Sequence, residues 1–280
     1  MLVGRKMGGY LIAHRLYSRV VELRQLTVAD VPACMKVAAD RNWAHSDRTW
    51  RFLLELGTGW GVFDGDELVG TTVVTSYSGI SAISMVLVDS RYGRQGIGGE
   101  LVSHVLDSGV SCLYATPYGK PLYERLGFHS VGKVTTYSGV YPRDGGGISR
   151  PAEPADLPFV VALDAEAFGV ERAALWEGLM ACGSVRVADS GVVASTLTNG
   201  TTMIGPVVSR FAADAIALVC DAAARAGQVK VHLHDDWVAR HVRARGVSTV
   251  GSSCDLMVRN ASDVPGDRSL YHAPVSMALG

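Results

Sequence analysis

The chain has 280 residues, a formal net charge of −1 and a charged fraction of 19%. This length allows about two domains, each with a core of its own, and the near-neutral charge argues against a nucleic-acid partner or an anionic membrane surface. The five cysteines are scattered and lack C-x-x-C spacing, which predicts reduced thiols and a cytoplasmic location.

The first 19 residues are predicted to be an N-terminal extension. Arg5 and Lys6 precede a short apolar run that faintly resembles a signal peptide. His14 and Arg15 interrupt the run, however, and no small-residue cleavage site follows it. No stretch of the chain reaches the roughly 20 apolar residues of a membrane-spanning helix, so we expect no membrane association.

Apolar periodicity from residue 20 onward predicts alternating strands and helices. The expected elements are a strand over 20–27, helices over 28–41 and 47–56, a hairpin of 60–63 with 67–76, and a strand over 81–88. Asp64-Gly65-Asp66 is a favourable turn sequence for that hairpin. The order is that of an α/β fold with helices on both faces of the sheet.

A glycine-rich segment, Arg91-Tyr92-Gly93-Arg94-Gln95-Gly96-Ile97-Gly98-Gly99, follows the last of these strands and leads into a helix. Loop amides and the positive end of a helix dipole together attract an anion, and glycines let the backbone approach a phosphate. The spacing fits neither a P-loop nor a dinucleotide fingerprint. We therefore predict a phosphate-binding loop of another kind; the alternative is an ordinary strand-to-helix turn.

A second motif, Leu122-Tyr123-Glu124-Arg125-Leu126-Gly127-Phe128, comes soon after the loop. We expect it to be a short helix that follows a strand over 111–115, ends at Gly127 and leads into a strand over 129–140. The two motifs together resemble the GNAT superfamily of N-acetyltransferases. Its coenzyme A loop reads [Q/R]-x-x-G-x-[G/A], with Gly93 in place of the first residue, and its closing segment often ends L-Y-x-x-L-G-F.

The resemblance covers about residues 20–140 and implies an acetyl-CoA-dependent N-acetyltransferase in which an amine attacks the thioester directly. In this family the pantetheine arm pairs with the edge of the fourth strand, and the loop amides hold the pyrophosphate. The coenzyme-binding residues so implied are Met85, Val86, Leu87, Val88, Gly93, Arg94, Gln95, Gly96, Ile97, Gly98, Gly99, Thr116, Gly119 and Tyr123. We expect no metal ion.

Tyr123 matches the family tyrosine that often protonates the departing thiolate. A phenol has an ordinary pKa of about 10, so it carries its proton at neutral pH. The alternative is a packed tyrosine whose hydroxyl only hydrogen-bonds the coenzyme.

The acceptor side is less defined by sequence. His45 is a candidate base, with an ordinary pKa of about 6.5, although a solvated loop histidine is the favoured alternative. Weaker candidates for the acceptor wall are Trp43, Asp47, Tyr77 and Tyr118; Trp43 could instead fill the core, and Asp47 could cap a helix. We expect a small-molecule amine as acceptor and allow for a homodimer. A protein acetyltransferase and a non-catalytic acyl-CoA sensor remain open.

An internal repeat predicts the layout of the second half. Arg24-Gln25-Leu26-Thr27-Val28-Ala29-Asp30-Val31-Pro32 aligns with Arg150-Pro151-Ala152-Glu153-Pro154-Ala155-Asp156-Leu157-Pro158. We expect a catalytic domain over 20–141, a linker over 142–149 and a second domain over 150–280. The layout resembles a bacterial group with an active N-terminal and a degenerate C-terminal GNAT domain. Both halves are thus expected to be GNAT folds, each a mixed, mostly antiparallel sheet flanked by helices.

The second copy is expected to have lost its coenzyme site. The segment Ile204–Asp214 stands at the position of the loop but has no glycine ladder, and a helix is expected over 215–226. His232-Leu233-His234-Asp235-Asp236 raises a rival hypothesis, because two histidines two apart on a strand face the same way and could bind a metal. The favoured interpretation is the end of a strand and the start of a helix.

Overall fold

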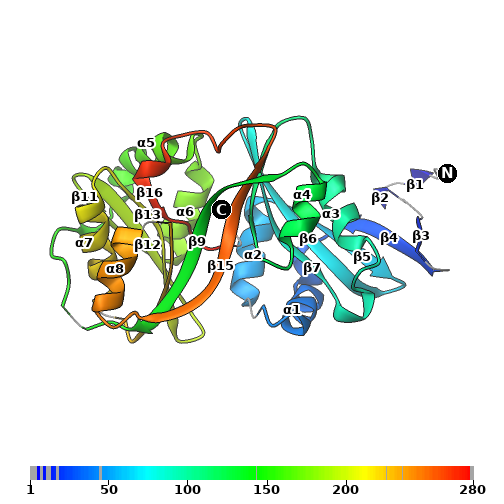
Figure 1. The fold of residues 1–280 in the computed structure, drawn as a ribbon, viewed down its shortest axis with the longest axis horizontal. Helices are drawn as coiled ribbons and strands as arrows, with labels where there is room; N and C mark the ends of the chain where they lie inside the picture. Colours follow the sequence, from blue (N-terminus) through cyan, green and yellow to red (C-terminus); the bar gives the residue numbers. More distant parts are fainter. Residues whose placement is uncertain are drawn as a thin grey trace. The chain divides into compact units, whose positions relative to one another are not determined.

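The computed structural model describes the backbone of residues 5–6, 9–10, 14–16, 19–43, 46–142, 144–224, 226–234 and 236–277, and the side chains from Val21 onward. Two compact units are formed by Met1–Ser76 with Ser81–Ser111 and by Tyr77–Ile80 with Cys112–Gly280. Each is an α/β unit with a mostly antiparallel sheet (Figure 1). The predicted fold class is therefore confirmed.

The first unit carries the glycine-rich loop at one end of its sheet. Its elements are β1 (Arg5–Lys6), β2 (Gly9–Tyr10), β3 (His14–Leu16), β4 (Arg19–Gln25), α1 (Val31–Asp40), α2 (Asp47–Leu56), β5 (Thr58–Asp64), β6 (Glu67–Tyr77), β7 (Ile80–Val88) and α3 (Ile97–Val105). The strand order is β7-β6-β5-β4-β3. Ile97 and Leu101 of α3 are buried against Val21, Val62 and Val69 of these strands, so the apolar face of α3 fixes it to the sheet.

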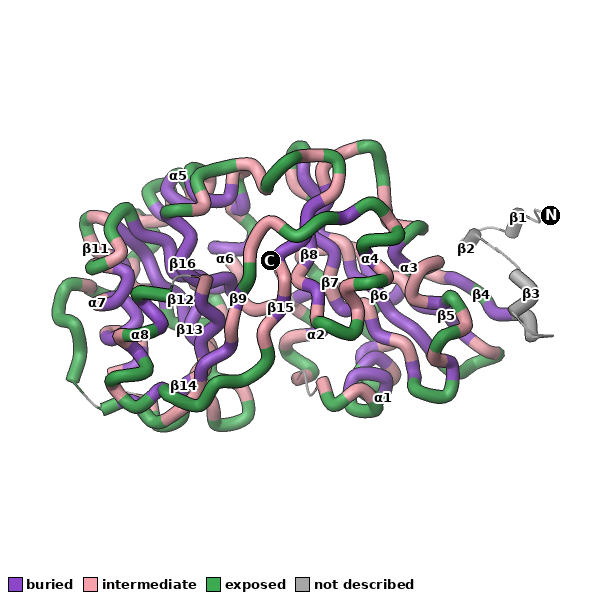
Figure 2. The backbone as a smooth tube through the Cα atoms, in the orientation of Figure 1, coloured by how far each residue is buried: buried purple, intermediate pink, exposed green. Residues whose placement is uncertain are grey.

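The second unit holds the remaining elements. They are β8 (Val110–Ala115), α4 (Lys120–Arg125), β9 (His129–Val140), β10 (Arg150–Pro151), α5 (Leu157–Phe168), α6 (Ala173–Cys182), β11 (Ser184–Ala188), β12 (Gly191–Thr198), β13 (Thr201–Ser209), α7 (Ala212–Ala223), β14 (Gln228–Leu233), α8 (Asp236–Ala244), β15 (Thr249–Arg259) and β16 (Tyr271–Ala273). The strand order is β10-β11-β12-β13-β14-β9-β15-β8, with β16 beside β13. Figure 2 shows that buried positions gather in these strands and on the inner sides of the helices.

The long strand β9 lies between two strands from the C-terminal part of the sequence. It pairs antiparallel with β14 on one side and with β15 on the other. Side chains add to the ladder, since the Thr135 and Ser253 hydroxyls lie 2.9 Å apart. The end of the first repeat is thus part of the same sheet as the second repeat, and the domain limits at 20–141 and 150–280 stay a prediction from sequence.

The predicted elements agree with the observed ones to within a few residues. Both ends of α2 and of β9 fall where the sequence places them, and Asp64 pairs with Glu67 across the expected hairpin turn. The helix expected over 215–226 is α7, which starts earlier at Ala212. The reason is local: the Ser209 hydroxyl accepts a hydrogen bond from the Phe211 amide at 3.3 Å and so fixes the chain just before the first turn.

The two repeats begin with the same capping device. In the first copy the Asp30 carboxylate accepts from the Thr27 amide at 2.8 Å and from the Arg24 guanidinium at 2.7 Å. In the second copy Asp156 takes the same part, at 2.7 Å from the Glu153 amide and 2.7 Å from Arg150. The Arg150 ion pair lowers the pKa of Asp156 to about 2. The recurrent Arg and Asp therefore start a helix in each repeat.

A buried ion pair joins α5 to the start of α6 in the second unit. The side chains of Asp164 and Arg172 are both 0% exposed. Arg172 donates from Nε and Nη2 to the two Asp164 oxygens at 2.8 and 2.7 Å, and its guanidinium stacks 3.7 Å from the centre of the Phe168 ring. Because neither side chain is exposed to solvent, this ion pair is stabilised by its two hydrogen bonds and not by hydration.

Loss of one partner of this pair should be costly. We expect Asp164→Asn to lower the free energy of unfolding by about 3–5 kcal/mol, because it leaves the Arg172 charge buried and unpaired. The matched control is Glu166→Gln on the same helix, whose ion pair with Arg210 is about half exposed; its loss should be far smaller, because solvent screens that pair. Urea unfolding of both variants measures the difference. Equal losses would contradict the assignment of Asp164 as the stabilising partner.

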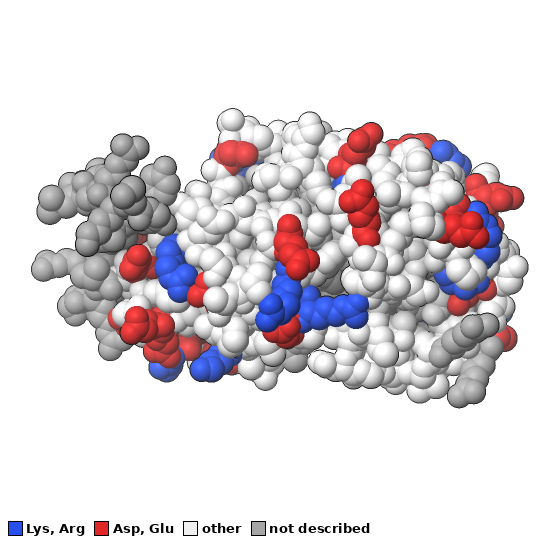
Figure 3. All heavy atoms as spheres, turned by 180° about the vertical axis from the view of Figure 1, so that it is seen from behind, with Lys and Arg blue, Asp and Glu red and all other residues white. Residues whose placement is uncertain are grey.

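Charges of both signs are mixed on the surface. The chain has 26 Lys and Arg against 27 Asp and Glu, and on the face drawn in Figure 3 blue and red side chains lie next to one another. Among the described residues, no helix has the length and apolar character needed to cross a bilayer.

Candidate coenzyme site

Two residues of the glycine-rich loop between β7 and α3 have a left-handed backbone conformation. A short 3-10 turn, η2 (Ser90–Tyr92), leaves the strand, and Gly93 then has an extended backbone. Arg94 has φ of 61° and Gly96 has φ of 89°. Gly96 is also the N-cap of α3. Only glycine adopts the conformation of Gly96 without strain, and a non-glycine residue in that region, such as Arg94, is a known mark of functional sites.

Consecutive backbone amides of this loop have no acceptor among the residues that the structure describes. Gly99 and Glu100 donate to the Gly96 carbonyl at 2.9 and 3.1 Å, which closes the first turn of α3. Within the described part of the chain, no acceptor pairs with the amides of residues 94–98. These N–H groups lie at the positive end of the helix dipole, an arrangement that can attract an anion of phosphate type.

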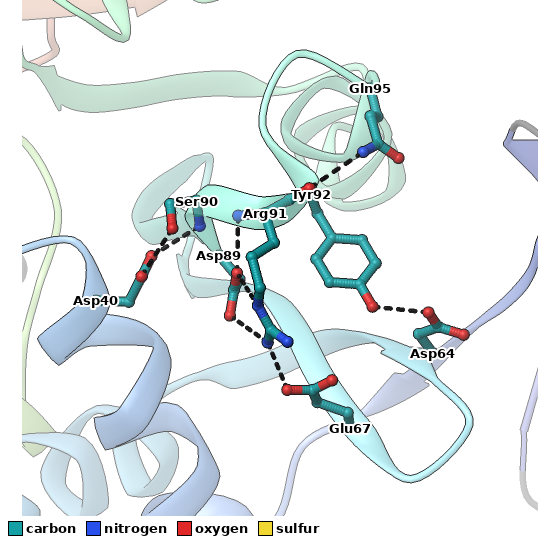
Figure 4. Close-up of polar contacts among 8 residues, drawn as sticks. All are labelled: Asp40, Asp64, Glu67, Asp89, Ser90, Arg91, Tyr92 and Gln95. Atoms are coloured by element: carbon teal, nitrogen blue, oxygen red, sulfur yellow. Dashed lines mark hydrogen bonds and ion pairs between the residues drawn. The ribbon is translucent and has the colours of Figure 1, made fainter.

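The start of the loop is held by α1. Asp40, the last residue of that helix, accepts from both the amide and the hydroxyl of Ser90, at 2.7 and 2.8 Å (Figure 4). Two bonds to one carboxylate fix the direction in which the chain leaves β7. Asp40 is therefore a support of the loop, although it lies about fifty residues away in the sequence.

A second support is the side chain of Arg91. Figure 4 shows it directed toward Asp89 and Glu67. It donates to the two Asp89 oxygens at 3.0 and 2.8 Å and also to Glu67. The Arg91 hydrogen bonds lower the pKa of Asp89. Asp89 itself is tied to β6 through its amide, which donates to the Val69 carbonyl at 2.9 Å. Arg91 thus braces the loop against the sheet.

Tyr92 is the third support. Its ring is buried with Ile97 and Leu101 in the core under α3, and its hydroxyl donates to Asp64 at 2.7 Å. Asp64 ends β5 at the hairpin turn. The loop is consequently anchored to α1, to the hairpin and to the core, and its amides are held in place before any ligand arrives.

Strand β7 has an irregular residue inside the segment predicted for the pantetheine arm. Met85 is buried and has φ of 51°. Its carbonyl accepts from the Thr71 hydroxyl at 2.8 Å. A positive φ at a non-glycine residue within a strand is uncommon and is held in place by the surrounding structure. Of the four predicted residues Met85, Val86, Leu87 and Val88, the first therefore has a distinctive backbone.

Tyr123 lies on α4 in the second unit and is 7% exposed. Its ring packs edge to face on Phe128, with centroids 6.1 Å apart. A Cβ on Gly119 would lie 3.0 Å from the ring, and the Gly119 amide donates to the Thr116 hydroxyl at 3.2 Å. Burial raises the pKa of Tyr123, and the described residues give its hydroxyl no hydrogen-bond partner. The phenol is therefore neutral and able to donate.

The residues predicted for the acceptor wall have diverse positions. His45 lies outside the described residues. Trp43 is half-buried. Asp47 is exposed in the first turn of α2 and pairs with Arg51 at 2.7 Å, while Ser46 is the N-cap. Tyr118 is 71% exposed. Tyr77 packs edge to face on Phe168 in the second unit, with ring centroids 5.9 Å apart.

The two histidines that raised a metal hypothesis have other partners. His232 Nδ1 lies 2.9 Å from the Thr136 hydroxyl, and His234 Nε2 lies 2.9 Å from the Tyr114 hydroxyl. Burial lowers the pKa of His234 to about 4. Asp235 lies outside the described residues, and the described ones contain no group of three His, Cys, Asp or Glu placed to hold a metal.

The Tyr92 support can be tested by removal of one oxygen. We expect Tyr92→Phe to keep the buried ring and to weaken coenzyme A binding about 2- to 10-fold, since one hydrogen bond of roughly 0.5–1.5 kcal/mol no longer fixes the loop. Asp66→Asn, an exposed position in the same hairpin turn, is the control. Calorimetric titration gives both affinities. If Tyr92→Phe binds like the parent protein, Asp64 does not position the loop.

Comparison with known proteins decides the family. A model of the acetyltransferase (GNAT) domain matches residues 44–141, and a second model of that description matches residues 160–273. The chain belongs to the GNAT acetyltransferase family. It has two GNAT domains in tandem, as the sequence predicts, and it is an acetyltransferase by family.

Several proteins resemble this GNAT chain over most of its length. The uncharacterized N-acetyltransferase YitH of Bacillus subtilis is 23% identical over 240 residues, which are 79% of this chain and 85% of YitH. A Pyrococcus horikoshii protein described as a candidate acetyltransferase has a TM-score of 0.79 at 19% identity and 99% coverage of both chains. A tandem GNAT protein from the clavulanic acid biosynthesis pathway has a TM-score of 0.58 at 14% identity, over 87% of this chain and all of its own. Both structures share the fold.

Proposed function

We propose that the protein transfers the acetyl group of acetyl-CoA to the amine of a small molecule, with the coenzyme pyrophosphate bound at the start of α3. The observation that carries the proposal is the run of amides at residues 94–98 for which the described part of the chain offers no acceptor. Their number and their place at a helix N-terminus suit a doubly charged diphosphate. Acetyl-CoA supplies the activated acyl group as a thioester.

The chemistry requires one proton donor that the chain can provide. The acceptor nitrogen attacks the thioester carbonyl and loses one proton, the carbon–sulfur bond breaks, and the sulfur leaves as a thiolate that takes up one proton. Tyr123 is neutral and buried, and its hydroxyl has no hydrogen-bond partner among the described residues, which supports its role as that donor. The products are an N-acetylated amine and free coenzyme A.

The nature of the acceptor can be tested through thiol release. The tandem layout is shared with a protein of a biosynthetic pathway, the clavulanic acid pathway, and this supports a small-molecule amine rather than a protein. A panel of small amines with acetyl-CoA should release thiol above background, whereas mixed proteins and peptides should not. Coenzyme binding without thiol release from any amine would instead indicate a non-catalytic acyl-CoA sensor.

Gly96 gives a direct test of the loop. We expect Gly96→Glu to abolish coenzyme A binding in calorimetry, because it adds a negative charge beside the diphosphate and strains a backbone with φ of 89°. Gly96→Ala isolates the strain, since the space beside that Cβ is open, and should weaken binding only partly. Gly227→Glu adds the same charge at an exposed glycine elsewhere and should bind normally. Normal binding by Gly96→Glu would refute the assignment.

Tyr123 gives a test of the chemistry. We expect Tyr123→Phe to lower kcat by about 100-fold or more and to leave coenzyme affinity nearly intact. Burial raises the pKa of the phenol above its ordinary value of 10.0, so the proton is present below that raised pKa. The kcat of the parent enzyme should therefore show no loss from this group up to about pH 10. An unchanged kcat in Tyr123→Phe would remove the residue from the acid role.

A further inference from the structure

Two central strands of the second unit pair over only part of their length. β13 and β14 run parallel from Thr201 with Gln228 to Ile204 with Val231. Beyond Ile204, β13 continues with a different partner, since Val207 pairs with Ala273 and Val208 with Tyr271 of β16. The end of β14 also contacts this short strand, as the His234 amide donates to the His272 carbonyl at 3.1 Å. β16 thus fills the opening where β13 and β14 part.

Residues 270–275 are buried in this opening. All six residues from Leu270 to Val275 are buried (Figure 2). His272 Nε2 lies 3.2 Å from the Ser209 carbonyl on β13. Arg172 of the buried ion pair donates to the Tyr271 hydroxyl at 3.3 Å. These contacts hold the buried run beside β13.

The position of Gly205 shows how closely residues 271–275 approach β13. A Cβ at this position would lie 2.0 Å from the Pro274 carbonyl oxygen and 3.0 Å from its carbon. The obstacle is backbone, so no side-chain rotation could relieve it. Residue 205 must therefore be glycine for residues 271–275 to lie beside β13.

The repeat defines what this opening corresponds to. β13 is the fourth strand counted from β10, just as β7, which is expected to pair with the pantetheine arm, is the fourth counted from β4. We propose that the opening beside β13 is the second repeat's counterpart of the coenzyme gap, and that its resident ligand is residues 271–275 of the same chain. An extended peptide offers the edge of β13 the amide N–H and C=O groups that a pantetheine arm would offer.

The start of α7 agrees with this assignment. At the corresponding loop of the second repeat, the Arg210 amide donates to the Ser190 carbonyl at 2.9 Å and the Phe211 amide to the Ser209 hydroxyl at 3.3 Å. The amides of Arg210 and Phe211 thus have acceptors within the protein, whereas the described residues give no acceptor to the amides of residues 94–98 before α3. The chain accordingly binds one coenzyme, in its first repeat.

Hydrogen exchange on the intact chain, measured with and without coenzyme A, tests this inference. The inference rests on the proposed function, because it compares the opening with the coenzyme site of the first repeat. The experiment distinguishes failure of the inference from failure of the proposed function. In the free protein the peptide covering residues 271–275 should exchange about 100-fold or more slowly than an unstructured peptide. Added coenzyme A should slow exchange at residues 94–98 and leave residues 271–275 unchanged. Fast exchange at 271–275 in the free protein, or its onset when coenzyme is added, overturns the inference. No change at 94–98 overturns the proposed function alone.

A pair of glycine variants tests whether residues 271–275 occupy the opening beside β13. Gly205→Ala should speed exchange at residues 271–275 at least 10-fold relative to β12, because its Cβ meets the Pro274 carbonyl. Gly227→Ala, where nothing lies within 4 Å of the added Cβ, is the control and should match the parent protein. If Gly205→Ala leaves residues 271–275 as protected as in the parent, the segment does not occupy the opening. The exchange of the parent protein decides the question even if Gly205→Ala fails to fold.

Discussion

The free amides before α3 are the constraint around which the first unit is built. A helix leaves its first N–H groups without partners, and the chain here adds to them the amides of a loop that turns twice into the left-handed region, at Arg94 and Gly96. Satisfaction of these donors by any nearby side chain would close the site. The described residues place no acceptor among them, so the local structure keeps its hydrogen-bonding capacity for a ligand.

Such a loop must be held from outside, because it has few bonds of its own. Three carboxylates do this from three elements: Asp40 from α1, Asp64 from β5 and Asp89 from the end of β7. Each of them bonds to the 3-10 turn that precedes the glycines, and none to the amides of residues 94–98. Acidic side chains beside an anion site would repel the ligand if they were free; their pairing with Ser90, Arg91 and Tyr92 directs them away from it.

The second repeat has a GNAT fold, and we propose that it binds no coenzyme. Its first helix starts with the same Arg–Asp device as the first copy, and its fourth strand still parts from the fifth. The opening is filled by Tyr271–Ala273, and the turn before α7 satisfies amides at Arg210 and Phe211 internally. The second repeat thus retains its architecture through backbone pairing and core packing, and the proposed loss of coenzyme binding rests on a few hydrogen bonds.

The sequence alone determined the repeat, the strand and helix order, the glycine-rich loop and the family, since each depends on local periodicity, on turn chemistry or on residues that are adjacent in the chain. It also placed Arg91 and Tyr92 beside the loop without revealing their partners. Only the tertiary structure decided that Asp40 and Asp64 hold the loop, that β9 lies between β14 and β15, and that residues 271–275 fill an opening beside β13. These contacts join segments that are far apart in the sequence, so no local pattern encodes them. The sequence contains many carboxylates that could support the loop and several short apolar runs that could fill the opening, and only the folded chain selects among them.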